Sequence, residues 1–262
     1  MENIKLWDTQ IPYQVEEDDF YPYMETHLLD TTSAAGAIVI FPGGGYGGRA
    51  DHEGSPIAEF FNSKGLHAFV VHYRVSPNRH PAPLADALKA LRIVRNNAEK
   101  WQIKPDKIAV CGFSAGGHLA ASTGVHFDLV KTAEDYLCDK VSARPDALIL
   151  CYPVISSKKF FHAGSFKNLL GEGYSDEMRD LMSLEEQVDQ HTPPSFLWHT
   201  AEDKGVPAEN SMAFASSLSK FDIPYELHIF PEGSHGLGLA PEFPEVAIWA
   251  NLCASWLKRM NW

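Results

Sequence analysis

From Ala37 onward, short apolar runs rich in β-branched residues alternate with segments of helical period. This rhythm predicts strand–helix–strand units around a mostly parallel sheet, with helices on its faces, and so an α/β fold. The expected strands are Ala37–Phe41, His67–Tyr73, Lys107–Cys111, Ala147–Cys151, Phe196–Thr200 and Tyr225–Phe230.

Three of the intervening segments carry helix signals. Ser55-Pro56 combines a capping residue with a proline at the first helical position, and Lys64-Gly65 is typical of a helix end. Pro83 suits the first turn of the next helix. Apolar residues three and four apart predict one buried stripe on that helix and one on the last helix: Leu84, Leu88, Leu91, Val94, Ala98 and Trp101, then Val246, Trp249, Cys253, Trp256 and Met260.

Two stretches break the rhythm, residues 127–144 and 154–190. The second is polar, is interrupted by glycines and lies between two expected strands. A lid or rim over a site and a solvated connection without a role in binding both fit it. Neither stretch resembles a linker, so we expect one domain over residues 1–262, with 154–190 as a small cap insertion.

Composition excludes several classes of protein. The net charge of −12 opposes binding to nucleic acid or to an anionic membrane surface. The four cysteines show no CxxC spacing, which disfavours a zinc site and a disulfide framework. The sequence has neither a signal-peptide pattern at Met1–Lys5 nor an apolar run long enough to span a membrane, so we expect a soluble, cytoplasmic protein.

The strongest chemical motif is the GxSxG sequence Gly112–Gly116, which lies directly between an expected strand and an expected helix. A tight strand-to-helix turn exposes the central Ser114 as a nucleophile, and it needs small residues two positions either side. The pattern alone also fits an ordinary glycine turn, but the flanking strand and helix favour the nucleophile.

A serine hydroxyl needs a base, and the base needs an acid that orients it. His235 lies in a flexible loop, Gly233–Gly236, just after the last expected strand, whereas five other histidines fit hydrogen-bonded packing positions better. Asp203 and Glu202 both follow the strand that ends at Thr200. We favour Asp203 as the acid; the alternative is a turn aspartate that caps the helix starting near Ala208. The five packing histidines are His67, His72, His118, His199 and His228.

Glycines at 43–45 and 47–48 follow the first strand of the rhythm. They allow backbone N–H groups to face a developing oxyanion, and we expect Gly44, Gly45 and Ala115 to be the donors. A phosphate-binding loop is the alternative, but neither GxxxxGK[ST] nor a complete GxGxxG pattern is present, and the chain is acidic.

These motifs together resemble α/β-hydrolase serine esterases. The chain is similar to hormone-sensitive-lipase-type carboxylesterases and more so to bacterial acetyl xylan esterase and feruloyl esterase-like enzymes. The resemblance spans about residues 36 to 258. Its motifs are Pro42–Tyr46, Glu53-Gly54, Tyr73–Val75, Pro83–Ala87, Gly112–Ala120, Asp203 with Val206-Pro207, and Gly233–Gly236.

The resemblance implies an α/β-hydrolase fold in which Ser114, His235 and Asp203 are nucleophile, base and acid. It also implies that Arg74 and Asp86 are structural residues that brace loops near the site. One departure is Pro42, where many relatives have a histidine, so a contact that braces the loop must be replaced or absent. Glu53 fits either the rim of a pocket or a cap of the following helix, and we favour the cap.

The sequence thus predicts a serine esterase that needs no cofactor or metal and acts on a small-molecule ester. Short acyl groups on sugars, acetyl groups above all, are the expected substrates, mainly from the resemblance. A peptidase or lactone hydrolase on the same scaffold is an alternative, as is a non-catalytic binding protein with this fold. A homo-oligomeric state is left open.

Overall fold

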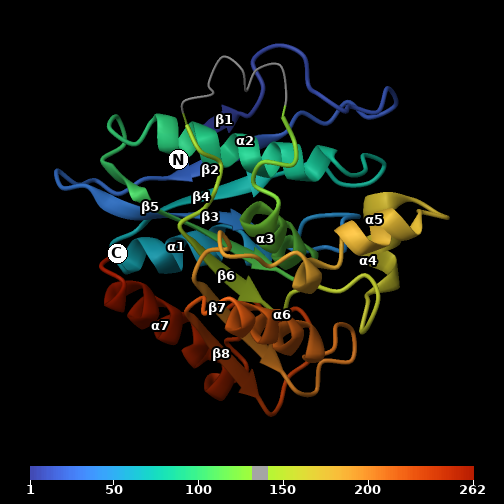
Figure 1. Ribbon diagram of the computed structural model, residues 1–262. Helices are drawn as coiled ribbons and strands as arrows, with labels where there is room; N and C mark the ends of the chain where they lie inside the picture. Colours follow the sequence, from blue (N-terminus) through green and yellow to red (C-terminus); the bar gives the residue numbers. More distant parts are fainter. Residues whose placement is uncertain (132–140) are drawn as a thin grey trace.

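An eight-stranded sheet in the order β1-β2-β4-β3-β5-β6-β7-β8 forms the centre of the computed structural model, which describes residues 1–131 and 141–262 (Figure 1). β1 and β2 pair antiparallel, as do β2 and β4, and all other neighbours are parallel. The strands are Asn3–Lys5 (β1), Tyr23–His27 (β2), Ala35–Phe41 (β3), His67–His72 (β4), Ile103–Phe113 (β5), Ala147–Cys151 (β6), Ser195–Thr200 (β7) and Tyr225–Phe230 (β8).

The helices lie on both faces of the sheet, as the sequence rhythm predicts. They are Ser55–Ser63 (α1), Ala82–Asn96 (α2), Ala115–Val125 (α3), Ala163–Leu170 (α4), Asp176–Leu181 (α5), Glu209–Lys220 (α6) and Pro244–Arg259 (α7), with short 3-10 turns at Asp51–Glu53 (η1) and Leu184–Glu186 (η3).

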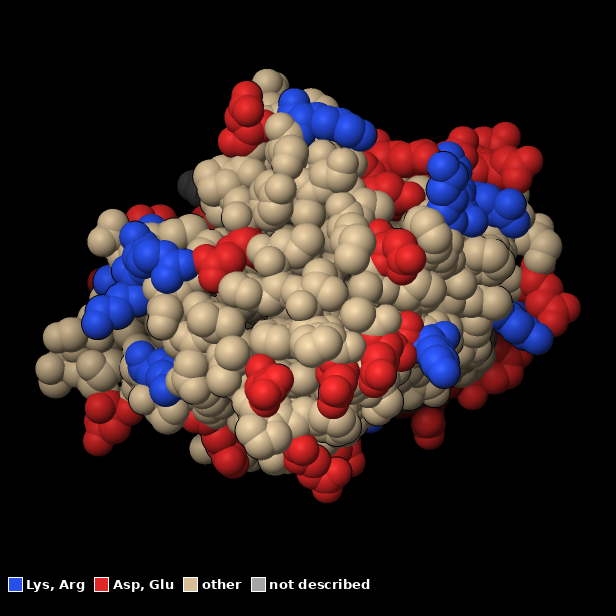
Figure 2. Space-filling view, turned by 90° about the horizontal axis from the view of Figure 1, so that it is seen from below, with Lys and Arg blue, Asp and Glu red and all other residues tan. Residues whose placement is uncertain are grey.

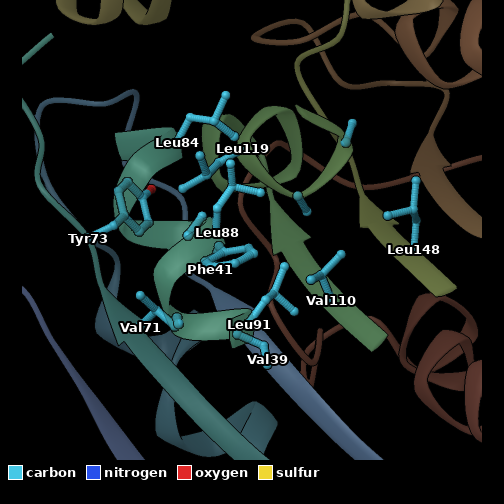
Figure 3. Close-up of a cluster of buried hydrophobic side chains, with 14 of the residues drawn as sticks. Val39, Phe41, Val71, Tyr73, Leu84, Leu88, Leu91, Val110, Leu119 and Leu148 are labelled. Atoms are coloured by element: carbon cyan, nitrogen blue, oxygen red, sulfur yellow. The ribbon is translucent and has the colours of Figure 1, made fainter. Parts of the chain in front are cut away.

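Alternating side chains of the parallel strands separate two apolar layers. Val39 and Phe41 of β3 belong to the apolar layer that includes residues of α2, α3 and α6, and Figure 3 shows this layer around Leu88 and Leu119. Ile38 and Ile40 belong to the layer on the other face, which includes residues of α1 and α7. The sheet is therefore buried on both faces, which explains why its strands have continuous rather than alternating apolar sequences.

All six expected strands are present: Ala147–Cys151 and Tyr225–Phe230 have the expected ends, and the ends of the other four differ by one to four residues. β5 is the largest difference, because it begins at Ile103 and runs on to Phe113, directly against Ser114. β1 and β2 were not expected. They form the antiparallel edge of the sheet beside β4, and their short polar sequences carry little strand signal.

Two helix ends differ from expectation. α2 ends at Asn96, so Ala98 and Trp101 of the expected stripe lie in the turns that follow it. Ser55 is the first residue of α1 rather than its cap: Gly54 precedes the helix without a side-chain cap, and the Ser55 hydroxyl donates to Glu25 Oε2 at 3.2 Å.

Residues 154–190 contain helices and are partly buried. They contain α4, α5 and η3, and Phe166 and Leu184 belong to the apolar layer below. Of the other interrupting stretch, residues 127–131 and 141–144 form neither helix nor strand, and residues 132–140 lie outside the described part of the chain.

A fully buried ion pair joins the N-terminal edge to the rest of the sheet. Arg74 follows β4, and its guanidinium donates to both carboxylate oxygens of Asp86 in α2, at 2.7 and 2.8 Å. Asp86 also accepts from Trp7 Nε1 at 2.8 Å, and Arg74 donates to the Pro12 carbonyl at 2.5 Å. The pairing expected for Arg74 and Asp86 is thus present, and it fixes the segment between β1 and β2.

Replacing Asp86 with Asn should destabilise the protein strongly, because it leaves a buried guanidinium without its counter-charge. We expect the free energy of unfolding in urea to fall by about 3–5 kcal/mol. Glu172→Gln removes a carboxylate from an exposed pair with Lys167 and should leave the unfolding midpoint nearly unchanged. Equal stability of Asp86→Asn and the unmodified protein would contradict this role.

Candidate active site

Ser114 occupies the sharp turn between β5 and α3 in a strained backbone conformation, with φ 53° and ψ −118°. Its N–H donates to the Cys151 carbonyl at 3.0 Å, and its carbonyl accepts from the Val154 N–H at 3.0 Å and the His118 N–H at 3.1 Å. Hydrogen bonds to the end of β6 and to α3 therefore fix the serine backbone from both sides.

The two glycines of the motif are required by close backbone contacts. A Cβ at Gly112 would lie 2.1 Å from the carbonyl oxygen of Gly116, and a Cβ at Gly116 would lie 2.1 Å from that of Phe41. Such distances are far below van der Waals contact, so neither position accepts a side chain. The motif is the strand-to-helix turn predicted from the sequence and not an unrelated glycine turn.

Ser114, His235 and Asp203 form a continuous chain of hydrogen bonds. His235 Nε2 lies 2.7 Å from Ser114 Oγ, and His235 Nδ1 lies 2.6 Å from Asp203 Oδ2. Because the carboxylate accepts from Nδ1–H, Nε2 is free to accept the serine proton. The structure thus brings together the three residues predicted from sequence positions more than 30 residues apart.

Asp203 is held in place by its own turn. Its Oδ1 accepts from the N–H groups of Gly205 and Val206, both at 2.9 Å, so only Oδ2 faces His235. Burial tends to raise the pKa of Asp203, but hydrogen bonds from His199, His235 and the Val206 N–H outweigh it and hold the pKa well below its usual range. The side chain does not cap α6, which begins at Glu209 without a side-chain cap.

Glu202, the other candidate acid, is exposed, and its carboxylate lies 3.4 Å from the Gly233 N–H. It makes no hydrogen bond with His235 among the described residues. The geometry therefore favours Asp203.

The five histidines expected to be packing residues are all hydrogen-bonded. His118 is one of them; it lies between the Tyr46 hydroxyl and the Met182 carbonyl, and burial lowers its pKa to about 4. His199 also contacts the site, because its Nε2 lies 2.8 Å from the Val206 carbonyl and 3.3 Å from Asp203 Oδ2. The partners of the other three are Leu29 N–H for His67, Glu25 for His72 and Glu226 for His228.

The glycine loop after β3 lies beside the nucleophile. A Cβ on Gly43 would lie 3.1 Å from Ser114 Cβ. Gly44 and Gly45 have φ values of +127° and +62°, which favour glycine. None of the hydrogen bonds among the described residues uses the N–H of Gly44, Gly45 or Ala115 as a donor. These three N–H groups are the donors expected from the sequence, and their role as an oxyanion hole stays a prediction.

Other contacts brace this loop in place of the histidine that Pro42 replaces. The Tyr73 hydroxyl donates to the Pro42 carbonyl at 2.6 Å, and Asn168 Nδ2 of α4 donates to the Gly45 carbonyl at 2.9 Å. Neither contact is evident in the sequence, because each joins segments that are distant in the chain.

Glu53 does not cap a helix, contrary to our expectation. Its side chain is buried, and Oε2 accepts from the Gly43 N–H at 2.7 Å while Oε1 accepts from the Tyr152 hydroxyl at 2.6 Å. Tyr152, which follows β6 at the same sheet edge as Ser114, was missed altogether. Its place directly after a parallel strand was the available signal, since sites form at the carboxyl ends of such strands.

Within residues 1–131 and 141–262, no three His, Cys, Asp or Glu side chains gather in a way that could hold a metal ion. The same part of the chain contains no helix of the length and apolarity needed to cross a bilayer.

Comparison with known proteins identifies the family. The profile of the BD-FAE family matches residues 29–218. This chain belongs to the BD-FAE family. The match covers the glycine loop, Ser114 and Asp203, whereas His235 lies beyond it.

Solved structures share the fold of this BD-FAE member over nearly its whole length. The acetyl ester-xyloside bifunctional hydrolase of Caldicellulosiruptor lactoaceticus is 46% identical, with a TM-score of 0.95 over 99% of this chain and 96% of that chain. The α/β hydrolase MGS-M1 from a deep-sea metagenome is 32% identical, with a TM-score of 0.75 over 98% of this chain and 96% of its own. The fold is therefore the α/β-hydrolase fold.

Curated relatives are longer. Endo-1,4-beta-xylanase B of Butyrivibrio fibrisolvens is 41% identical over 84% of this chain and 35% of its own length. The acetylxylan esterase of Xylanibacter ruminicola is 34% identical over 86% of this chain and 46% of its own length. The chain thus spans about a third to a half of these two proteins.

Asp203→Asn should lower kcat for p-nitrophenyl acetate by about 10³- to 10⁴-fold, because an amide favours the wrong tautomer of His235. Glu202→Gln, its matched control one residue away, should keep kcat close to that of the unmodified protein. Steady-state kinetics of both purified variants test the assignment, and a larger loss in the Glu202 variant would reverse it.

Proposed function

We propose that this chain is a serine carboxylic-ester hydrolase that acts on short acyl esters of sugars. The observation that carries the proposal is the hydrogen-bonded chain from Ser114 Oγ to His235 and Asp203, at 2.7 and 2.6 Å. All three roles of a nucleophilic triad are filled, which favours an enzyme over a binding protein with the same fold.

The mechanism follows from this geometry. His235 Nε2 takes the proton of Ser114 Oγ as the oxygen attacks the ester carbonyl, and the N–H groups of Gly44, Gly45 and Ala115 stabilise the resulting oxyanion. His235 then protonates the leaving alcohol, which departs from the acyl-enzyme. Water, deprotonated by His235, attacks the acyl carbon and releases the acid, so that Ser114 regains its proton. These steps require no cofactor.

The substrate class is supported by the relatives and by charge. One solved relative is named for hydrolysis of an acetyl ester and a xyloside, and one curated relative is an acetylxylan esterase. The net charge of −12 suits a neutral sugar ester better than a polyanion. Figure 2 shows one face of the molecule, where acidic side chains surround a broad uncharged area and basic side chains lie mainly toward the sides.

Residues 154–190 are proposed to be a small cap of a single domain spanning 1–262. Asn168 of α4 bonds to the oxyanion loop, and Ser165 Oγ lies 3.8 Å from where a Cβ of Gly45 would be. Burial and the proximity of His235 lower the pKa of His162, the capping residue of α4. These contacts and the interaction with His235 support a rim over the site. The cytoplasmic location remains a prediction, and oligomeric state stays open.

Acetylated xylo-oligosaccharides and p-nitrophenyl esters of rising chain length test the proposal. We expect release of acetate from the sugars and a rate with aryl esters that falls from acetate to longer acyl groups. Ser114→Ala should reduce the rate of both reactions to that of uncatalysed ester hydrolysis.

Four other outcomes would change the proposal. Release that does not depend on Ser114 would contradict it, and no release from any ester would favour the binding protein. A preference for long acyl chains would contradict the short acyl pocket, and faster turnover of peptides or lactones than of esters would favour those alternatives.

A further inference from the structure

Glu53 is a buried carboxylate that connects two loops of the active site. One oxygen accepts from the N–H of Gly43, directly before the proposed oxyanion donors, at 2.7 Å. The other accepts from the Tyr152 hydroxyl at 2.6 Å. The Glu53 side chain is only 3% exposed, so water contributes little to the solvation of its charge.

Tyr152 extends this connection to the loop that carries His235. Its hydroxyl oxygen accepts from the Gly238 N–H at 2.8 Å, and its ring meets the His235 ring edge-on, with centroids 5.1 Å apart. His52 also connects Glu53 to the loop that carries His235, since its Nε2 lies 2.9 Å from the Gly236 carbonyl and 3.7 Å from Glu53 Oε1.

The positions of the hydrogens in these contacts fit an ionised Glu53 carboxylate. A tyrosine hydroxyl has one hydrogen. Because Gly238 N–H donates to the Tyr152 oxygen, that hydrogen is free to point at Glu53 Oε1. Gly43 N–H occupies the other carboxyl oxygen. Both Glu53 oxygens therefore accept, as an ionised carboxylate does, and neither needs a proton of its own.

We propose that Glu53, acting with Tyr152, is a positioning residue for ester hydrolysis: it fixes the oxyanion loop relative to His235, and its negative charge stabilises the imidazolium that forms during acyl transfer. The inference rests on the proposed function, because it assigns a role within the same reaction. It makes Glu53 a second carboxylate of the site besides Asp203.

Electrostatics around the two groups agree with this role. Burial raises the pKa of Glu53, while the Tyr152 hydroxyl, the Gly43 N–H, His52 and His235 all favour its charged form. Within the described residues, Ser114, Asp203 and Tyr152 contact His235, and Glu53 and His162 interact with it at longer range. Asp203 and Glu53 are the two carboxylates among them, so removing either negative charge should make a protonated His235 less stable.

Two variants, Glu53→Gln and Tyr152→Phe, distinguish the effect of the Glu53 charge from that of the hydrogen bonds that connect the two loops. Gln keeps the volume and can still accept from Gly43 N–H, but it carries no charge and leaves the Tyr152 hydroxyl without an acceptor. For this variant we expect kcat for p-nitrophenyl acetate to fall about 10- to 100-fold with KM nearly unchanged, since the oxyanion contact is made only in the transition state.

The pH dependence of kcat/KM provides a second test, because replacing a merely structural residue would not shift it. In Glu53→Gln the acid limb of kcat/KM should shift to lower pH by about half a unit, because a nearby negative charge no longer favours protonation of the base. Tyr152→Phe keeps the carboxylate, so its kcat should fall without that shift.

Glu25→Gln is the matched control. Glu25 is a partly buried carboxylate on β2 that also bonds a hydroxyl, that of Ser55, and a histidine, His72. This variant should keep both kcat and the pH profile. Thermal unfolding of all variants identifies any that fail to fold, and Tyr152→Phe tests the inference if Glu53→Gln does not fold.

A fluorophosphonate probe distinguishes failure of this inference from failure of the proposed function. Ser114 Oγ attacks the phosphorus of the probe and fluoride leaves, and the reaction needs the base and the oxyanion donors but no ester substrate. Slower labelling of folded Glu53→Gln than of the unmodified protein supports the inference even if no ester tested is hydrolysed.

Equal labelling rates, or equal kcat values with superimposable pH profiles, would overturn the inference while leaving the esterase intact. Absence of Ser114-dependent labelling and of ester hydrolysis in the unmodified protein would overturn both.

Discussion

The backbone of one residue, Ser114, is the constraint on which the site depends. Its positive φ is unfavourable for a serine, and it persists because Cys151 at the end of β6, Val154 just beyond it and His118 of α3 hold its N–H and carbonyl by three hydrogen bonds. The absence of side chains at Gly112 and Gly116 allows this close packing. The sheet and the first turn of α3 therefore form a rigid frame for the nucleophile, and the other site residues are brought to it by loops from neighbouring strands.

Sequence patterns predicted the parts of this arrangement that depend on local chemistry. The buried parallel strands have continuous apolar sequences, and Ser114, Asp203 and His235 follow such strands, so their positions could be inferred. β1 and β2 could not, because short edge strands with polar residues have no periodic apolar signal. Glu53 was misassigned for a related reason: its position before α1 fits a cap, and only the tertiary structure shows that Gly43 and Tyr152 bind its two oxygens.

The two carboxylates near His235 have different environments. Asp203 is surrounded by N–H donors from its own turn and from two histidines, and these contacts hold its charge in place. Glu53 is bound by one backbone N–H and one phenol, and burial acts against its charge. Asp203 therefore contacts His235 directly, whereas Glu53 connects the loops on either side of Ser114. Such a connection holds the glycine loop and His235 in one geometry although they lie on segments far apart in the chain.

The N-terminal edge has a consequence for how shortened forms of this protein behave. The family match begins at residue 29, after β1, β2 and Trp7. Yet Trp7 is one of the partners of Asp86, and β2 covers the edge of β4. A version trimmed to the matched region would leave β4 as a bare apolar edge, and such edges pair readily with other chains and promote aggregation. The limits of a conserved family profile are therefore not the limits of the unit that can be produced in isolation.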